Sequence, residues 1–303
     1  MKRYKKADAI TVGTIGYGGA FNMGRHHLNE MKKAGMTPTA VCEIDPERLT
    51  VATQDFPGIE TYSSVTEMLR RSDVQLLAII TPHNTHAKLA LQCLKAGRHV
   101  VCEKPLAITT AECDAMIAAA KKHGVVLSTY HNRHWDGCIL EALKRIRAGA
   151  IGDIVRIEAH MGGWGKPRDW WRSSKTISGG ILYDWGVHLL EYTLQLMDAD
   201  IATVTGFSKR GFWADQTPYK ADTNEDEGYA VIRYANGAWS TLTISAIDSN
   251  PKAGRLEITG TKGSYVMDGN TFECITHKAG ETVVTKGANP PSESWRFYQN
   301  IAD

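Results

Sequence analysis

The first 130 residues alternate between two kinds of segment, and this alternation limits the fold more than any other feature. Short runs rich in Val, Ile and Leu are separated by longer stretches with the apolar period of an α-helix. Such alternation is typical of βαβ units, in which helices cover both faces of a parallel sheet. We expect strands at residues 9–15, 39–42, 76–80, 99–102 and 125–129, and helices at 24–34, 46–53, 65–70, 85–96 and 110–123.

The pattern changes after residue 130, where strands begin to dominate. Asn236-Gly237 separates two of them and predicts a hairpin with a tight primed turn. We therefore expect an α/β chain: a doubly wound parallel sheet in residues 1–130 and an α+β domain with an open, antiparallel or mixed sheet in residues 131–303. In the second domain we expect helices at 138–148 and 181–197, and strands at 154–161, 227–234, 238–246, 255–259 and 264–267.

A glycine-rich loop follows the first expected strand, and a helix begins near Gly24. This arrangement places backbone N–H groups and the positive end of a helix dipole against a pyrophosphate. The spacing departs from G-x-G-x-x-G, because position 21 is Phe, so a simple βα turn is the alternative. The candidate cofactor-binding residues of this loop are Gly16, Gly18, Gly19, Ala20, Phe21, Asn22 and Met23.

Glu43 ends the second expected strand, 27 residues after Gly16. A carboxylate at this place is suited to bond the adenosine ribose hydroxyls and to repel a 2′-phosphate, which favours NAD over NADP. The alternative is a solvated loop carboxylate. Because Arg48 is close in sequence and could accept a phosphate, NADP also stays open.

Two further strands run into polar loops at their carboxyl ends. One loop is residues 81–86 and the other is Glu103-Lys104-Pro105. Ligands of open α/β sheets bind at this edge, so we expect both loops to flank a nicotinamide. The alternatives are that Thr85 caps the following helix and that His86 packs in the core. The remaining cofactor candidates are Thr81, Pro82, His83, Asn84, His86, Glu103, Lys104 and Asn132.

These motifs occur together and in a familiar order between about residues 11 and 261. Gly16-x-Gly18-Gly19, Thr81-Pro82 with His86, Glu103-Lys104-Pro105 and Gly179-Gly180-x-x-x-Asp184-x-Gly186-x-His188 resemble the glucose–fructose oxidoreductase/inositol dehydrogenase (Gfo/Idh/MocA) family. The resemblance implies a Rossmann domain followed by an α+β domain with a large, open, mostly antiparallel sheet. Members often assemble through that sheet, so the resemblance implies a homo-oligomer, a dimer or a tetramer.

The resemblance also implies an activity. Members typically use NAD(P) to transfer hydride between nicotinamide and a secondary hydroxyl or ketone of a sugar, sugar derivative or inositol. By position, Lys104, Asp184 and His188 match the catalytic residues of the family, and the Lys104–Pro105 peptide is expected to be cis. Two features depart from the family: the phosphate loop is about two residues longer, and the aromatic loop at 164–172 is not a general family motif.

The chemistry of these residues agrees with a dehydrogenase. Removing hydride from an alcohol requires a base within hydrogen-bond reach, and His188 is suited to that role near neutral pH. Asp184 lies four residues earlier, where it could orient the imidazole, and Lys104 could donate to the substrate oxygen. The alternative is that Asp184, His188, Glu191 and Gln195 form a solvated stripe. The rest of this helix is apolar nearly all round, however, which predicts burial.

The loop at 164–172 contains three Trp and two Arg residues in nine positions. Tryptophan faces suit the C–H faces of a sugar, and arginine donors suit its hydroxyls or an acidic group. A packed loop or an oligomer contact explains the same residues equally well. The charged run at 222–227 is expected to be an exposed loop. The substrate-binding candidates are Lys104, Asn132, Trp164, Arg168, Trp171, Arg172, Asp184 and His188.

Composition excludes several other classes. The chain of 303 residues has 35 basic and 33 acidic side chains, so no basic domain points to nucleic acid. No apolar run is long enough for a membrane span, and six scattered cysteines predict reduced, mostly buried thiols rather than a metal site or disulfides. We expect a cytoplasmic protein. Because the chain stops in what looks like the start of a helix at 295–303, while relatives continue for tens of residues, we also expect a truncated form.

Two competing functions share these features. One is a redox-neutral glycosidase, in which tightly held NAD oxidises a ring carbon, elimination cleaves the glycosidic bond, and the hydride returns. The other is an NAD-binding regulator without turnover. The presence of Lys104, Asp184 and His188 argues against the regulator.

Overall fold

The computed structural model describes residues 6–252 and 254–303, so residues 1–5 of the expected first domain lie outside it. Its contacts divide the chain into two units. Unit 1 comprises the residues up to Asn132 together with Trp295–Asp303, and unit 2 comprises Arg133–Ser294. Each unit has its own sheet and its own core, and each is described by itself.

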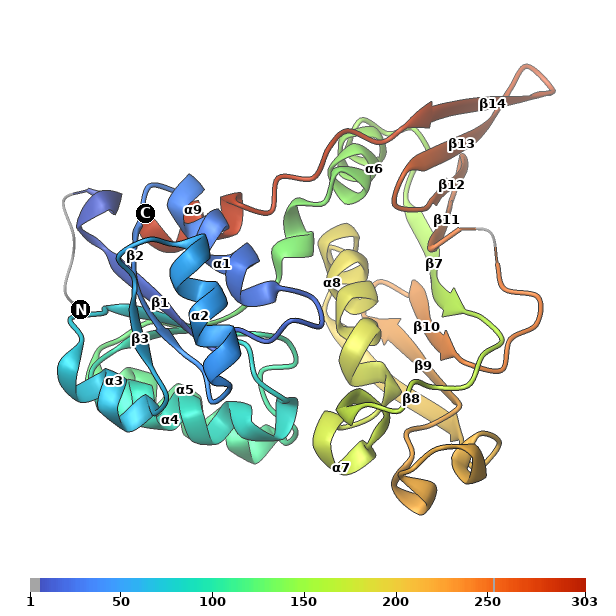
Figure 1. The fold of residues 1–303 in the computed structure, drawn as a ribbon. Coiled ribbons are helices and arrows are strands. Elements are labelled where there is room, and N and C mark those ends of the chain that lie inside the picture. The colour runs from blue at the N-terminus through green and yellow to red at the C-terminus, as the bar shows by residue number, and fades with distance from the viewer. Residues whose placement is uncertain (1–5, 253) are drawn as a thin grey trace. The chain divides into compact units, whose positions relative to one another are not determined.

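Unit 1 contains a six-stranded parallel sheet in the order β3-β2-β1-β4-β5-β6, which is the Rossmann order (Figure 1). The prediction of a doubly wound sheet is therefore confirmed. The strands are β1 (Thr11–Ile15), β2 (Thr37–Cys42), β3 (Glu60–Tyr62), β4 (Leu76–Ile79), β5 (His99–Cys102) and β6 (Leu127–Thr129). The helices of the βαβ series are α1 (Met23–Lys33), α2 (Pro46–Asp55), α3 (Val65–Arg71), α4 (His86–Lys95) and α5 (Thr110–His123).

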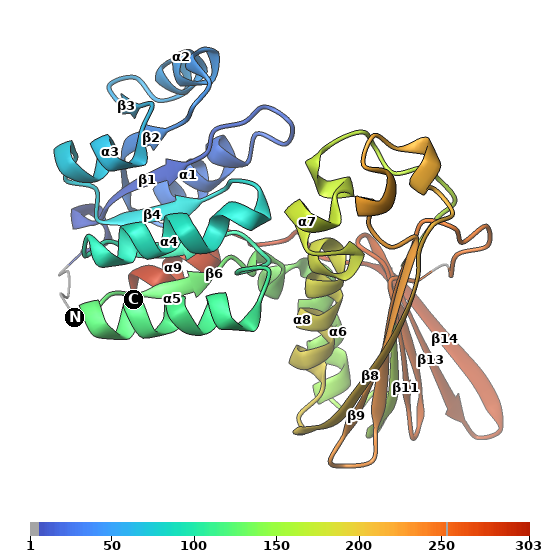
Figure 2. The ribbon, with the colours of Figure 1, turned by 90° about the horizontal axis from the view of Figure 1, so that it is seen from below.

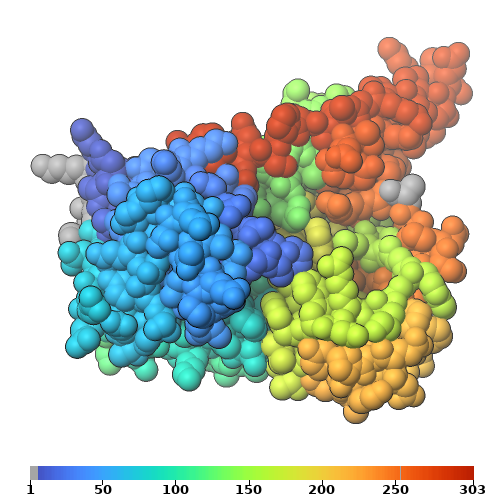
Figure 3. Space-filling model, viewed as in Figure 1, coloured from blue at the N-terminus to red at the C-terminus, as the bar shows by residue number. Residues whose placement is uncertain are grey.

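The helices of unit 1 lie on both faces of its sheet. Met68 of α3, Leu94 of α4 and Met116 of α5 join the strands in one buried apolar cluster. On the opposite side α1 is in contact with the last helix, α9 (Arg296–Ala302). In the space-filling view, the light-blue side chains of α2 form part of the front surface of unit 1 (Figure 3).

The position of α9 differs from the prediction, which placed residues 295–303 in the second domain. In the structure this segment belongs to unit 1. The physical reason is burial, because Phe297 is 5% exposed and Tyr298 is fully buried within the unit. Apolar contacts with residues far away in sequence therefore decide where the end of the chain packs.

Unit 2 contains an eight-stranded sheet in the order β14-β13-β12-β11-β7-β10-β9-β8, whose strands are labelled in Figure 1 and seen from below in Figure 2. Only the β7–β10 pair is parallel, so the predicted mostly antiparallel sheet is confirmed. The strands are β7 (Ile154–Gly162), β8 (Ile201–Lys209), β9 (Glu227–Tyr234), β10 (Trp239–Ser245), β11 (Leu256–Gly260), β12 (Gly263–Met267), β13 (Thr271–Lys278) and β14 (Glu281–Ala288).

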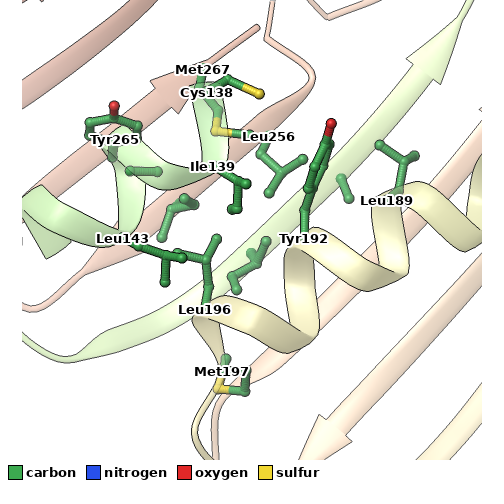
Figure 4. Close-up of a cluster of buried hydrophobic side chains, with 14 of the residues drawn as sticks. Cys138, Ile139, Leu143, Leu189, Tyr192, Leu196, Met197, Leu256, Tyr265 and Met267 are labelled. Atoms are coloured by element: carbon green, nitrogen blue, oxygen red, sulfur yellow. The ribbon is translucent and has the colours of Figure 1, made fainter. Parts of the chain in front are cut away.

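The helices α6 (Gly137–Arg147) and α8 (Val187–Leu196) pack on one face of this sheet. Their apolar side chains meet those of the central strands in a single buried cluster. Figure 4 shows Ile139 and Leu143 from α6 and Leu189 and Tyr192 from α8 gathered around Leu256 of the sheet. This core fixes α8 and therefore His188, which α8 carries.

The hairpin predicted at Asn236-Gly237 forms, but the predicted primed turn is wrong. A primed type I turn needs positive φ at both central residues. Gly237 has φ +86°, whereas the described non-glycine residues with positive φ are Asn22, Lys220 and Ala279. The hairpin between β13 and β14 instead has a two-residue turn, Ala279-Gly280, in which both φ values are positive, as a primed type I turn requires. That hairpin, red in Figures 1 and 3, projects from the rest of unit 2.

Two further expectations concern the thiols and the membrane. The six cysteines are free thiols, and five of them are buried, as predicted. Burial raises the pKa of the Cys42 and Cys93 thiols to about 12, so both stay protonated. None of the helices in the described part of the chain is long and apolar enough to cross a membrane.

Candidate functional site

The glycines of the loop after β1 have different spatial roles. Gly16 has φ +104°, and a Cβ there would lie 2.6 Å from the carbonyl oxygen of Ile80. A Cβ at Gly24 would lie 2.5 Å from the Tyr17 ring, so only glycine lets α1 approach the strand this closely. A Cβ at Gly18 would have nothing within 4 Å. Gly24 therefore allows the close helix–strand packing that the third glycine of G-x-G-x-x-G allows, although its spacing differs. Gly18 leaves open space for a phosphate.

The first turn of α1 completes an anion-binding arrangement. Asn22 precedes the helix in a left-handed conformation, and its side chain makes no capping hydrogen bond. Instead its Oδ1 accepts from Arg48 Nη2 at 3.2 Å. Because the first N–H groups of a helix have no intrahelical partners, those of α1 are available to a ligand. The loop and helix therefore fit the pyrophosphate of a dinucleotide.

Tyr17 is held at every polar group it has. Its N–H donates to Glu43 Oε2 at 2.6 Å, its carbonyl accepts from Arg48 Nε at 2.9 Å, and its hydroxyl donates to Asp55 Oδ2 at 2.7 Å. Burial raises the pKa of the Tyr17 hydroxyl, and the bond to Asp55 raises it further, so the phenol stays a donor. The backbone of the loop is therefore fixed between Gly16 and Gly18.

Glu43 is bound to the backbone rather than solvated. Besides Tyr17, its carboxylate accepts from the N–H groups of Ile44 at 2.7 Å and Asp45 at 3.2 Å. These bonds fix a negative charge at the carboxyl end of β2, next to the phosphate loop. Each carboxylate oxygen can accept more than one hydrogen bond, so acceptor capacity remains for ribose hydroxyls.

The two polar loops after β4 and β5 are joined by a buried histidine. His86 lies with Nδ1 2.8 Å from the carbonyl oxygen of Pro105 and Nε2 2.9 Å from that of Thr81. Burial lowers the pKa of His86, although both carbonyls act in the opposite direction. This geometry favours the packing alternative for His86. The Lys104–Pro105 peptide that precedes this contact is cis, as the resemblance implied.

The other residues of the first loop divide between core and surface. His83 is buried and packs against the His86 ring, while Asn84 is exposed. The Thr85 hydroxyl bonds the Thr81 hydroxyl at 2.6 Å and the Pro82 carbonyl at 2.7 Å, and makes no capping bond to α4. Thr85 therefore occupies the N-cap position of α4, as the alternative held, but without a side-chain capping bond. Asn132 is the last residue of unit 1, in a 3-10 turn that spans Asn132–Trp135.

A second group of candidate residues lies in unit 2, on the helix predicted at 181–197. Its first turn, Leu182–Gly186, is a π-helix, and the regular helix α8 follows. Single π-helical turns recur at functional sites, since they re-aim side chains. Asp184 lies in this turn and forms an ion pair with Arg172 Nη1. The predicted pairing of Asp184 with His188 stays a prediction, because the polar contact shown for Asp184 is with Arg172.

His188 is 5% exposed, and its ring meets the edge of Trp185 at 5.4 Å between centroids. The guanidinium groups of Arg133 and Arg255 lie over the same Trp185 ring, at 4.6 and 5.6 Å from its centroid. Arg133 also donates to Asp136 at 2.9 Å. The solvated-stripe alternative therefore fails for His188, which is buried beside the Trp185 ring.

Glu225 is a site residue that the sequence analysis missed. The charged run at 222–227 was expected to be exposed, but Glu225 and Asp226 are 7% and 1% exposed. Glu225 Oε2 accepts from the N–H of Ile181 at 3.0 Å, and its other oxygen pairs with Lys175. Burial alone would raise the pKa of Glu225, but the bond from Lys175 lowers it. The carboxylate therefore anchors the start of the turn that carries Asp184.

The contact with Glu225 requires glycine at position 180. Its φ is +136°, and a Cβ there would lie 2.9 Å from Glu225 Oε2. The Gly179-Gly180 pair was therefore the available signal for a side chain approaching the helix start. The sequence alone cannot say which of 303 residues that side chain belongs to.

The aromatic loop at 164–172 divides between two clusters. The guanidinium carbon of Arg172 lies 4.9 Å from the centroid of the Trp171 ring, and Arg172 also forms the ion pair with Asp184. The guanidinium carbon of Arg168 lies 5.7 Å from the centroid of the Trp170 ring. Trp164 is 58% exposed and packs instead against Phe212 and Trp213, at 5.3 and 5.7 Å. The structure thus brings Arg172 to Asp184, and places Trp164 in a separate aromatic group.

Comparison with known proteins identifies the family. The model described as "Oxidoreductase family, NAD-binding Rossmann fold" matches residues 10–131, and the GFO/IDH/MocA C-terminal domain matches residues 139–266. The chain belongs to the GFO/IDH/MocA oxidoreductase family. This family member is therefore an NAD-binding oxidoreductase, and its glycine loop and α1 fit that cofactor.

Individual relatives of this oxidoreductase are distant. It is 27% identical to scyllo-inositol 2-dehydrogenase (NADP(+)) IolW of Bacillus subtilis, over 97% of this chain and 77% of the relative. It is also 27% identical to myo-inositol 2-dehydrogenase of Thermotoga maritima, over 90% of this chain and 80% of that one. The solved structure of levoglucosan dehydrogenase with NADH and levoglucosan shares the fold, with a TM-score of 0.81 and 23% identity over 97% of this chain and 90% of that one.

Proposed function

We propose that this oxidoreductase is an NAD(P)-dependent dehydrogenase that transfers hydride between nicotinamide and a secondary hydroxyl or ketone of a sugar, sugar derivative or inositol. The observation that carries the proposal is His188, buried on α8 directly after the turn in which Arg172 holds Asp184. A buried histidine four residues after a carboxylate on the same helix is suited to general base catalysis. The names of the two inositol dehydrogenases above support the substrate class.

Each catalytic residue has a defined task in the proposed reaction. Bound NAD(P) supplies the hydride acceptor. His188 takes the proton of the substrate hydroxyl, and the negative charge of Asp184, fixed by Arg172, stabilises the imidazolium that forms. Lys104, on the cis-proline loop, donates to the substrate oxygen and stabilises the charge that develops there. Arg168, Trp171 and Arg172 are proposed to contact the hydroxyls and the C–H face of the substrate.

We further propose that NAD is preferred to NADP. The Glu43 carboxylate is fixed by three backbone N–H groups, so it cannot turn away from an incoming 2′-phosphate without breaking them. Arg48 donates to the phosphate loop. NADP stays an alternative because the name of the Bacillus subtilis relative specifies it.

A homo-oligomer is proposed on the basis of the sheet of unit 2. Its helices α6 and α8 cover one face. On the other face Phe207 stacks on Tyr229, and Phe207 is 66% exposed. Exposed aromatic side chains on a broad sheet are typical of an interface. We propose a dimer or a tetramer that buries this face.

One screen tests the activity. Purified protein is given a panel of sugars, inositols and glycosides with NAD or NADP, and NADH formation and product release are followed separately. We expect net reduction of NAD by at least one polyol or sugar. Aglycone release without net NADH would show the redox-neutral glycosidase instead, and binding of NADH without any turnover would show a regulator.

A further inference from the structure

A chain of buried polar groups in unit 1 links the end of the protein to Lys104. The Tyr298 hydroxyl is hydrogen-bonded to His27 Nδ1, and His27 Nε2 lies 3.1 Å from Glu103 Oε1. The other Glu103 oxygen accepts from the backbone N–H of Lys104 at 3.1 Å. His27 and Tyr298 are both fully buried.

The donors and acceptors of this network are all satisfied by one assignment of protons, in which His27 is neutral. An ionised carboxylate only accepts, so His27 Nε2 carries a proton and donates to Glu103. In that tautomer Nδ1 is an acceptor, and the Tyr298 hydroxyl donates to it. Burial raises the pKa of Tyr298, which keeps the phenol protonated. Burial alone would also raise the pKa of Glu103, but the hydrogen bond from His27 lowers it, so Glu103 is ionised.

The three side chains come from three distant parts of the sequence. His27 is on α1, Glu103 follows β5, and Tyr298 is on α9, 271 residues after His27. The centroid of the Tyr130 ring lies 4.1 Å from that of the His27 ring and 5.6 Å from that of the Tyr298 ring. This packing holds the three rings in place. Apolar residues of similar volume would stabilise such a core at least as well, so stability alone does not account for the polar chain.

The hydrogen-bonded network fixes the orientation of the side chains that belong to it. A fully satisfied buried network fixes the rotamers of all its members, whereas an apolar contact permits small rotations. Here the network ends on the carboxylate that holds the backbone of Lys104. A displacement of about 1 Å at a catalytic group can cost about a hundredfold in rate.

We propose that Tyr298 is a positioning residue for Lys104: its hydroxyl orients His27, His27 orients the Glu103 carboxylate, and that carboxylate holds the backbone of the catalytic loop. The proposal rests on the proposed function, in which Lys104 contacts the substrate. It assigns to α9 a role in turnover in addition to its role in packing.

The test compares two variants of the whole polypeptide, each of which loses one phenol hydroxyl from the group of packed rings around His27. Tyr298→Phe removes the donor to His27. Tyr130→Phe is the matched control, because it keeps the ring that packs on His27 and removes a hydroxyl that is bonded to His26 at 3.1 Å. We expect Tyr298→Phe to lower kcat about tenfold, with KM and the Kd of NADH within about twofold. Tyr130→Phe should leave kcat within about twofold.

Amide hydrogen exchange gives a readout that does not depend on turnover. In Tyr298→Phe the Lys104 amide should exchange at least about fivefold faster, while the Ile80 amide, bonded to Ile15 at 2.8 Å in the sheet, should not change. Equal exchange at Lys104 in the two variants, or faster exchange with full kcat, would overturn the proposal. Failure of the proposed function is seen separately, as the absence of turnover in the unaltered protein.

Discussion

Arg48 bonds to both ends of the predicted phosphate loop. Its guanidinium donates both to the carbonyl of Tyr17, at the start of the loop, and to the side chain of Asn22, at its end. A Cβ at Gly19 would lie 3.3 Å from Arg48 Nη1, so the middle of the loop also passes close to this group. A planar group with several donors is suited to span a loop in this way.

We predict that Arg48→Gln weakens NADH binding about tenfold, because two charge-assisted hydrogen bonds to the loop are lost. Arg48→Lys should be intermediate, since one ammonium group cannot make both bonds in the same geometry. Fluorescence titration with NADH measures the dissociation constant. Arg70→Gln, at an exposed position on α3, is the control. An unchanged Kd in Arg48→Gln would show that the loop does not need this support.

At the level of elements, the turn before α8 depends on a residue more than 40 positions away. The N–H of Ile181 donates to Glu225, and Gly180 leaves the space that the carboxylate occupies. The π-helical turn that follows carries Asp184, and α8 carries His188. The position of both groups therefore follows from how this turn begins.

Gly180→Ala should disturb the turn, because the new methyl group would meet Glu225 and the backbone has a φ of +136°. We expect strain of roughly 1–3 kcal/mol, seen as a lower Tm, together with a lower kcat. NADH binding, a property of unit 1, should stay within about twofold. Gly163→Ala is the matched control, since a Cβ there has nothing within 4 Å. Unchanged kcat in Gly180→Ala would mean that the turn does not position the catalytic groups.

These elements also show what the sequence could and could not predict. The βαβ alternation of unit 1 was readable for its helices and for every strand except the three-residue β3, because these segments carry their own apolar period. Strand β8 was missed, since all nine of its residues are exposed and show no alternation of burial. The contacts of Glu225 with Ile181 and of Tyr298 with His27 could not be read either, since no local pattern specifies a partner at such sequence distance.

The catalytic candidates were found by resemblance, and the structure adds their surroundings. Arg172 was proposed as a substrate residue, and its ion pair with Asp184 gives it a further role. His86 was proposed to contact the cofactor, but both of its ring nitrogens face backbone carbonyls. Hydrogen-bond partners of this kind depend on tertiary structure, so residue type and spacing alone do not predict them.

At the scale of the molecule, the open face of the unit 2 sheet is the feature that bears on assembly. Phe207 and Val204 lie on the same edge strand and pair with Tyr229 and Ile232 respectively. Ile232 belongs to the core beneath the helices, so Val204 points to the helix side and Phe207 to the opposite face. The two positions therefore separate the effect of the open face from that of the strand itself.

Phe207→Asp should dissociate the proposed oligomer, because it would bury an unpaired charge in an apolar contact. Light scattering after size-exclusion chromatography measures the mass. Val204→Asp is the control, and its mass should equal that of the unaltered protein. A monomeric unaltered protein, or an unchanged mass in Phe207→Asp, would contradict assembly through this face.

The central claim is that this oxidoreductase is a dehydrogenase in which Lys104 contacts the substrate. Hydride transfer to NAD, measured with and without the Lys104 side chain, tests it most directly. With the polyol or sugar found by the screen, Lys104→Ala should lower kcat by at least about a hundredfold, with the Kd of NADH within about threefold. Lys88→Ala, at an exposed position on α4, should keep full activity. Full turnover in Lys104→Ala, or no NAD reduction by the unaltered protein with any substrate of the panel, would contradict the account.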